Sequence, residues 1–170
     1  MSDDELINKI RQGDEAAEEE LIQRYYQSIL YYCKVRCGSW ATAEDLTQET
    51  FLRLFRYLPS YKYEGKFKTY LFSIANRLCI NESQSIPLCQ LGEEGGGREC
   101  DKIHQIEDWD EIRSLLEKLS PMQREAVILR FGEHMSYQEI AKVTGCSMWA
   151  AHARVKYALK NMRKESGHEQ

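Results

Sequence analysis

Residues 136–164, "SYQEIAKVTGCSMWAAHARVKYALKNMRK", place a short apolar helix, a glycine and a second, basic helix in immediate succession. This order and spacing predict a helix-turn-helix motif. Ala141 is small enough to let the two helices approach closely, and Gly145 can adopt the positive φ that the turn between them requires. "SYQE" at 136–139 has the spacing of a capping box, and Ser147 can cap the second helix. The C-terminal part of the chain is therefore predicted to be helical.

Helical periodicity continues on the N-terminal side of this motif, and no stretch alternates as a β-strand would. Asp14 can cap a long helix that ends at Gly38, and Thr42 and Asp45 have capping-box spacing at the start of the next one, which stops before Pro59. Helices are predicted at residues 16–37, 43–58, 67–81, 109–118 and 120–131, where Ser120 can act as the cap. The predicted fold class is all-α.

Residues 82–108 interrupt the helical pattern with Pro87 and the cluster "GEEGGG" at 92–97. Glycine and proline break helices, and an acidic, glycine-containing segment behaves as a flexible linker. The sequence therefore predicts two small helical domains, residues 1–81 and residues 109–170, joined by this acidic linker.

The net charge of −4 is distributed unevenly along the 170 residues. Basic and acidic side chains number 11 and 12 in residues 1–81, 4 and 10 in residues 82–118, and 8 and 5 in residues 119–170. The last segment is positive enough to contact phosphates. The N-terminus, "MSDDELINKI", lacks the features of a secretory signal, and no apolar run approaches the length of a membrane span. We expect a cytoplasmic protein without direct membrane insertion.

The six cysteines are Cys33, Cys37, Cys79, Cys89, Cys100 and Cys146. They form no Cys-x-x-Cys pair, and without a secretory signal reduced thiols are the expectation. A metal or redox sensor using Cys33 and Cys37 with His104, His134 or His152 is an alternative, although two helical cysteines four apart more often form a partly buried pair. The chain has no phosphate loop, nucleophile elbow or zinc-hydrolase motif, so we expect neither an enzyme nor a cofactor.

The last helix has an apolar stripe and an opposite polar face. The residues predicted to face inward are Met148, Ala151, Val155, Leu159 and Met162. Those predicted to face outward are Trp149, His152, Ala153, Lys156 and Lys160. A capped helix of this kind fits a DNA recognition helix, whose leading end reads base edges while basic side chains such as Arg154 and Lys156 meet phosphates. A basic amphipathic helix with a solvated face is the structural alternative.

A second candidate surface is "RYLPSYKYEGKFKTYLF" at 56–72, where aromatic residues alternate with lysines. Rings can stack on unpaired bases while lysines follow the backbone of a single strand, although the same rings can also fill a core. A third is the helix "AEDLTQETFLRLFR", with Thr47, Phe51, Leu54 and Leu58 predicted inward. Asp45, Gln48, Glu49, Leu52, Arg53 and Arg56 are predicted on its outer stripe, which by physics alone is a solvated face with one Glu49–Arg53 ion pair.

Taken in order, "AEDLTQETFLRLFR", "FKTYLFSIANRLCIN" and "LSPMQREAVILRFGEHMSYQEIAKVTGCS" resemble bacterial RNA polymerase sigma factors of the extracytoplasmic-function type. The resemblance covers residues 10 to 164 and implies the two conserved sigma regions called 2 and 4. It implies a transcription initiation factor that binds core RNA polymerase and promoter DNA, with an anti-sigma factor as a regulatory partner. Residues 148–153, "MWAAHA", depart from the family's commoner recognition-helix pattern.

The resemblance implies a role for each candidate surface. The helix at 43–58 would dock on the largest polymerase subunit through Asp45, Gln48, Glu49 and Leu52. The segment 59–81 would recognise and melt the minus-10 element through Tyr61, Lys62, Tyr63, Lys66, Phe67, Lys68, Tyr70, Asn76 and Arg77. The helix at 147–161 would read the minus-35 element through Ser147, Trp149, His152, Arg154, Lys156 and Lys160.

The other hypothesis is a two-domain helix-turn-helix regulator that is not a polymerase subunit, because this motif alone occurs in many repressors and activators. Such a regulator would carry a ligand-binding or dimerisation domain in its N-terminal half. In this chain that half carries the helix 43–58 and the aromatic and basic segment in sequence, which favours the sigma-factor reading.

Overall fold

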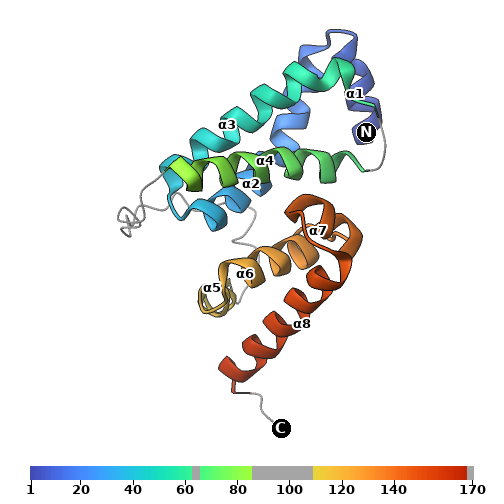
Figure 1. Cartoon of the computed structure of the whole chain (residues 1–170). Helices are drawn as coiled ribbons and strands as arrows, with labels where there is room; N and C mark the ends of the chain where they lie inside the picture. The colour runs from blue at the N-terminus through green and yellow to red at the C-terminus, as the bar shows by residue number, and fades with distance from the viewer. Residues whose placement is uncertain (63–65, 86–108, 168–170) are drawn as a thin grey trace. The chain divides into compact units, whose positions relative to one another are not determined.

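The computed structural model describes residues 1–62, 66–85 and 109–167, and within these ranges all regular structure is helical (Figure 1). The chain divides into two compact units, Met1–Gly96 and Gly97–Gln170. The prediction of an all-α fold is confirmed. None of the described helices has the length and apolar character that crossing a membrane requires.

Unit 1 is a bundle of three long helices with a short helix packed against the first of them (Figure 1). Its elements are α1 (Asp3–Arg11), α2 (Glu15–Cys37), α3 (Trp40–Tyr57), the short 3-10 helix η1 (Leu58–Ser60) and α4 (Phe67–Ser85). Each of α2, α3 and α4 packs against the other two. Their shared core is made of large side chains with no exposed surface, among them Leu21, Ile29, Tyr32, Leu54, Leu71 and Phe72.

Polar caps set where the long helices begin and end. The Asp14 carboxylate accepts hydrogen bonds from the first amides of α2, and Gly38 ends that helix with φ 77°, as predicted. The predicted start of α3 was wrong. The helix begins at Trp40 with Ser39 as its cap, because the Ser39 hydroxyl reaches the amide of Thr42 at 3.4 Å directly after the glycine.

The helix α1 was missed in the sequence. The sequence feature that marks its start is the capping box of Ser2 and Glu5. The helix has only nine residues, which are too few to show a clear apolar period. Asp3 joins α1 to α2 by accepting bonds from Arg24 Nη1 at 2.8 Å and the Tyr25 hydroxyl at 2.6 Å. The N-terminal segment is therefore part of the bundle.

The helix α4 continues to Ser85, so residues 82–85 of the predicted linker are helical. Residues 86–108 lie outside the described ranges, and with them most of that linker. The linker and the domain limits drawn from it stay predictions.

The described part of unit 2, residues 109–167, contains four helices and a π-helical turn: α5 (Trp109–Glu117), α6 (Pro121–Val127), η3 (Ile128–Gly132), α7 (Tyr137–Thr144) and α8 (Met148–Glu165). Ser120 caps α6 as predicted, but the α-helix predicted to reach residue 131 widens into η3 after Val127. One core cluster contains Leu116, Leu119, Val127 and Ala158. The Arg124 guanidinium donates to three carbonyl oxygens at the end of α5, those of Leu116, Glu117 and Leu119.

Candidate nucleic-acid interface

The turn between α7 and α8 has the geometry predicted for a helix-turn-helix. Gly145 adopts φ 71°, and its amide donates to the carbonyl of Ala141 at 2.9 Å. Ser136 and Glu139 form the predicted reciprocal capping box at the start of α7. The Ser147 hydroxyl accepts from the amide of Ala150 at 3.1 Å and starts α8. Local sequence therefore fixes both helix ends at this turn.

The buried face of α8 is displaced from the predicted one by part of a turn. Ala151, Val155 and Ala158 are buried, and Met162 is half-buried against the core cluster. The inward placement of Met148 was wrong, since 40% of its surface is exposed. The stripe 151, 155, 158 and 162 places position 148 at the edge of the packed face, in a first turn that the core does not cover.

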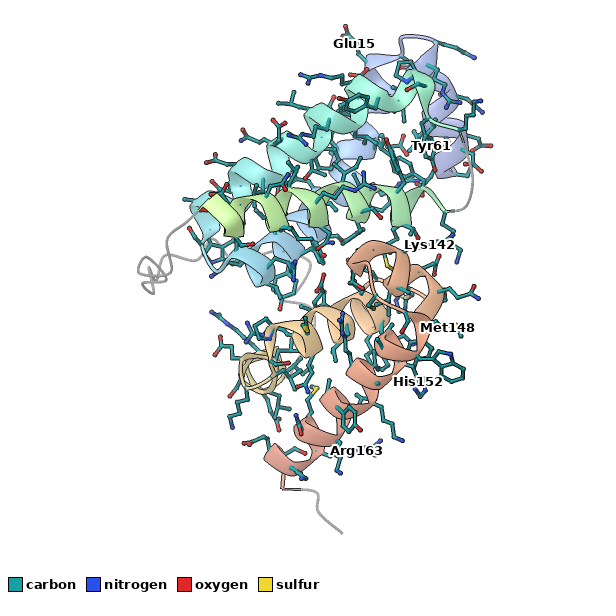
Figure 2. The ribbon with its side chains drawn as sticks, in the orientation of Figure 1. Glu15, Tyr61, Lys142, Met148, His152 and Arg163 are labelled. Atoms are coloured by element: carbon teal, nitrogen blue, oxygen red, sulfur yellow. The ribbon has the colours of Figure 1, made fainter. Side chains whose placement is uncertain are left out.

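The opposite face of α8 carries aromatic and basic side chains. Trp149 is 77% exposed, and His152, Lys156 and Lys160 are also exposed, while Arg154 is half-buried. In Figure 2, Met148, His152 and Arg163 mark the course of the helix. From residue 148 to 164 the helix has five lysines and arginines and no acidic residue. Its exposed face is therefore suited to a polyanion.

Tyr157 was missed in the sequence as a member of this face. It is 57% exposed and lies eight residues after Trp149, a spacing that places both residues on the outer side of the helix. A helical projection of the sequence could have revealed this spacing and placed Tyr157 on the outer face. Ser147 is exposed, but its hydroxyl already accepts the capping bond.

His152 is held by a neighbour on α7. Its ring meets that of Tyr137 edge to face, with ring centroids 4.8 Å apart, and the Arg130 guanidinium lies over the same tyrosine ring at 4.6 Å. Arg130 also donates to the carbonyl of Met135 at 2.9 Å. These contacts orient His152 from the side while leaving it exposed. Neither Tyr137 nor Arg130 was identified from the sequence.

The aromatic and basic segment of unit 1 contains both surface and core residues. Tyr61 and Tyr70 stack with ring centroids 4.3 Å apart, and both are half-buried. Burial raises the pKa of the Tyr70 phenol, so its hydroxyl remains protonated at neutral pH. Lys62, Lys66 and Arg77 are exposed and Lys68 is half-buried, whereas Tyr63 lies outside the described residues.

Two residues predicted in this segment lie in the core. Phe67 is 2% exposed and meets the Tyr25 ring edge to face at 5.9 Å. Asn76 is also buried, and its Oδ1 accepts from the Tyr32 hydroxyl at 3.2 Å. Direct contact of either side chain with DNA would require local rearrangement, because both are covered by protein.

Arg11 connects α1 to the start of this segment. Its Nε and Nη2 each donate to the carbonyl of Leu58 at 3.3 Å, and Nη2 also donates to the carbonyl of Tyr61. The partners are 47 and 50 residues apart in sequence, so no local pattern predicts the contact. The guanidinium fork thus holds the backbone of Tyr61, whose ring stacks on Tyr70.

Replacing Arg11 by alanine is expected to lower the free energy of unfolding of unit 1 by about 1–2 kcal/mol, because charge-assisted bonds to two carbonyls are lost. Thermal denaturation of the full chain measures the change. The control is Arg11→Lys, which keeps the charge without the planar fork and is expected to recover only part of the loss. Full recovery with lysine would contradict the assigned role of the fork.

The outer face of α3 agrees with its predicted orientation. Asp45 and Gln48 are exposed, Leu52 is 62% exposed, and Glu49 is half-buried in a 2.8 Å ion pair with Arg53 Nε. Thr47, Phe51, Leu54 and Leu58 are buried on the inner face, as predicted. An exposed leucine among acidic and amide side chains is a mixed surface of the kind that proteins use to bind one another.

The cysteines of unit 1 differ in their surroundings. Cys33 and Cys79 are buried and Cys37 is half-buried, and burial raises the pKa of the Cys37 thiol. A raised pKa keeps the thiol protonated at neutral pH, whereas the thiolate is the metal ligand. Across residues 1–62, 66–85 and 109–167, no three His, Cys, Asp or Glu side chains are grouped to hold a metal. His104 lies outside these residues.

Family comparisons match both units. The model of sigma-70 region 2 matches residues 21–85, and a model of sigma-70 region 4 matches residues 109–162. "RNA polymerase sigma factor YlaC" of Bacillus subtilis is 30% identical over 155 residues, which cover 86% of this chain and 90% of the relative. "ECF RNA polymerase sigma factor BldN" of Streptomyces coelicolor is 31% identical over 150 residues, which cover 83% of this chain. The match spans 57% of the length of that relative.

Two solved structures share the fold. CnrH in complex with the cytosolic domain of CnrY gives a TM-score of 0.68 at 19% identity, with 97% of both chains covered. RpoE in complex with the anti-sigma factor NepR, from Bartonella quintana, gives 0.64 at 18% identity, with 89% of this chain and 98% of that one covered. At these identities the likeness concerns the fold alone.

Proposed function

This chain belongs to the sigma-70 family of RNA polymerase sigma factors, of the extracytoplasmic-function type, and we propose that its two units recognise different parts of a promoter. It is a transcription initiation factor that directs polymerase to promoters. Unit 2 reads the minus-35 element as duplex, and unit 1 recognises and melts the minus-10 element. The observation that carries this division is the capped helix α8, with its exposed aromatic and basic face.

For unit 2, the supporting contacts are those of the helix-turn-helix. The leading end of α8 presents Trp149 and His152, and Lys156 and Lys160 follow one and two turns later. A recognition helix uses its first turns for base edges and its later basic residues for the phosphate backbone. Ser147 and Arg154 complete the proposed set, Ser147 as the helix cap and Arg154 from the flank.

For unit 1, the support is the stacked pair of Tyr61 and Tyr70 beside exposed Lys62, Lys66 and Arg77. Unpaired bases stack on aromatic rings while basic side chains follow their backbone. Lys68 and Tyr63 remain in the proposed set. Phe67 and Asn76 are assigned a supporting role, because both are buried and Phe67 contacts the Tyr61 ring.

Partners are proposed for the outer face of α3 and for the protein as a whole. Asp45, Gln48, Glu49 and Leu52 are proposed to contact the largest subunit of core RNA polymerase. An anti-sigma factor is proposed as a second partner, as the Bartonella quintana neighbour was solved with one. Binding to polymerase and to promoter DNA places the protein in the cytoplasm, and the chemistry of transcription belongs to the polymerase.

Reconstituted transcription tests the division of labour. Replacing His152 by alanine is expected to weaken binding of the holoenzyme to upstream duplex by about 1–3 kcal/mol where a base contact is lost. Replacing Lys156, which is assigned to phosphate, is expected to cause a smaller loss that does not depend on the sequence. Replacing Tyr61 by alanine is expected to remove about 1–3 kcal/mol of stacking from capture of the opened strand and to leave upstream binding unchanged. Duplex binding measures the first two effects, and permanganate reactivity of promoter thymines measures the third.

Each variant is first compared with the wild type in thermal denaturation, so that loss of function is separated from unfolding. Core polymerase without the chain is the reference for promoter-directed initiation. Equal loss of both signals in both sets of variants would contradict the division of labour. Normal binding to DNA without support of initiation would favour a regulator that is not a polymerase subunit.

A further inference from the structure

The first six residues of α8 have an unusual composition for a surface that reads DNA. Residues 148–153, "MWAAHA", contain no arginine, lysine, asparagine, glutamine, aspartate or glutamate. These six residue types make the usual hydrogen bonds to base edges in the major groove. The polar side chain of this stretch is His152, which packs against Tyr137. The leading end of the helix is therefore predominantly apolar.

Trp149 is the largest apolar group at this end. Its side chain is 77% exposed, and the neighbouring Met148 is also exposed. Burying such surface in a complex is favourable in proportion to the apolar area removed from water. Its helical neighbours Ala150 and Ala153 are small and half-buried, and His152 is the next large exposed side chain along this face. The indole is thus available to a partner that approaches closely.

We propose that α8 reads the minus-35 duplex mainly through an apolar contact, in which the Trp149 ring packs against the C5-methyl group of a thymine in the major groove. The inference rests on the proposed function of α8 and names the base feature that it recognises. The thymine methyl is the apolar mark that distinguishes this base in the major groove. An indole donates one hydrogen bond and accepts none, so it cannot make the bidentate contacts by which guanine or adenine is read.

The distribution of charge along α8 also favours an orientation in which its N-terminal end points towards the bases. Basic side chains begin with the half-buried Arg154 and continue with Lys156, Lys160, Arg163 and Lys164 on exposed positions. Phosphates on the groove walls are their natural partners, which directs the N-terminal, apolar end of the helix towards the groove floor. Trp149 lies at that end, and Tyr157 lies two turns further along.

The test uses holoenzyme reconstituted from core polymerase and the full chain. Duplexes selected from a random upstream library define the minus-35 element, and each thymine in it is then replaced by deoxyuridine, which lacks the methyl group. At the contacted position, this replacement is expected to weaken binding of the wild type about fourfold. Fourfold corresponds to about 0.8 kcal/mol, the free energy gained by burying one methyl or methylene group. The Trp149→Ala holoenzyme is expected to bind thymine and deoxyuridine duplexes equally at that position.

Tyr157→Ala provides the matched control, since it removes an exposed aromatic ring from the same face. It is expected to keep the wild-type preference for thymine. The proposal is overturned if no thymine shows a methyl effect, or if Trp149→Ala retains it. Failure of the proposed function would give a different result: the wild-type holoenzyme would select no preferred sequence from the upstream library.

Fluorescence gives a second readout on the same contact. The chain has three tryptophans, Trp40, Trp109 and Trp149, so the double variant Trp40→Phe and Trp109→Phe leaves the indole of α8 as the single reporter. Its emission is measured on the full chain without core polymerase, whose own tryptophans would hide this signal. It is expected to shift to shorter wavelength when the selected duplex binds, and to shift less with the deoxyuridine duplex. An unchanged emission on saturating duplex overturns the contact.

Discussion

Replacing Asp45 and Glu49 together by lysine is expected to lower the affinity of the chain for core RNA polymerase by about 100-fold. Both side chains lie on the outer face of α3, and the proposed partner surface must be complementary to their charge. Placing like charges against each other across an interface costs several kcal/mol, and 100-fold corresponds to about 2.7 kcal/mol. Competition with the labelled wild-type chain for core polymerase measures the loss.

The folded state should tolerate this double substitution, because Asp45 is exposed and the Glu49–Arg53 pair is half-exposed, where ion pairs contribute little. The matched control is Glu15→Lys with Glu19→Lys, which makes the same change in net charge on exposed positions of α2. A similar loss in both double variants would contradict a specific contact on α3 and indicate general electrostatic attraction. Circular dichroism should report unchanged helical content in each variant.

Replacing Phe67 by alanine is expected to lower the free energy of unfolding of the chain by about 3–5 kcal/mol, the usual cost of removing a phenylalanine from a core. The ring is buried at the start of α4, between Tyr25 and Tyr61 at centroid distances of 5.9 and 6.5 Å. Denaturant unfolding of the full chain measures the effect. We expect loss of strand capture in this variant to follow from loss of folded protein.

The exposed neighbour Lys66 supplies the control, and its replacement by alanine should change stability by no more than about 0.5 kcal/mol. A Phe67→Ala variant with wild-type stability and defective strand capture would contradict the core assignment. It would show instead that the ring reaches a base, as the sequence pattern alone had suggested.

Helix type and most helix ends were predictable because their causes are local. Asp14, Gly38, Ser120, Ser136 and Ser147 act through residues within four positions of themselves, and the structure has them in these roles. The all-α fold follows from apolar periodicity over long segments. The same reasoning misplaced the start of α3 because two candidate caps lay close together, and the hydroxyl nearer to Gly38 acts as the cap.

The candidate surfaces were only partly predictable, because orientation within an aromatic segment depends on the rest of the fold. Phe67 and Tyr70 are both aromatic and three residues apart, yet Phe67 fills the core and Tyr70 stacks on Tyr61. Arg11 and Tyr137 are positioned by contacts between separate helices, which no spacing in the sequence reveals. On α8 the predicted stripe contained Leu159 where the structure buries Ala158, because a leucine carries a stronger apolar signal than the alanine beside it.

The position of α1 bears on how members of the family can diverge. The family model matches from residue 21, so α1 lies outside the matched segment, although Arg11 holds the backbone of Leu58 and of Tyr61, which stacks on Tyr70. An exchange in this leading helix can therefore shift the surface proposed to capture the promoter strand without altering any residue that would touch DNA. Promoter preference could then change through a helix that the family model does not match, and comparisons restricted to the proposed DNA-contacting side chains would overlook its source.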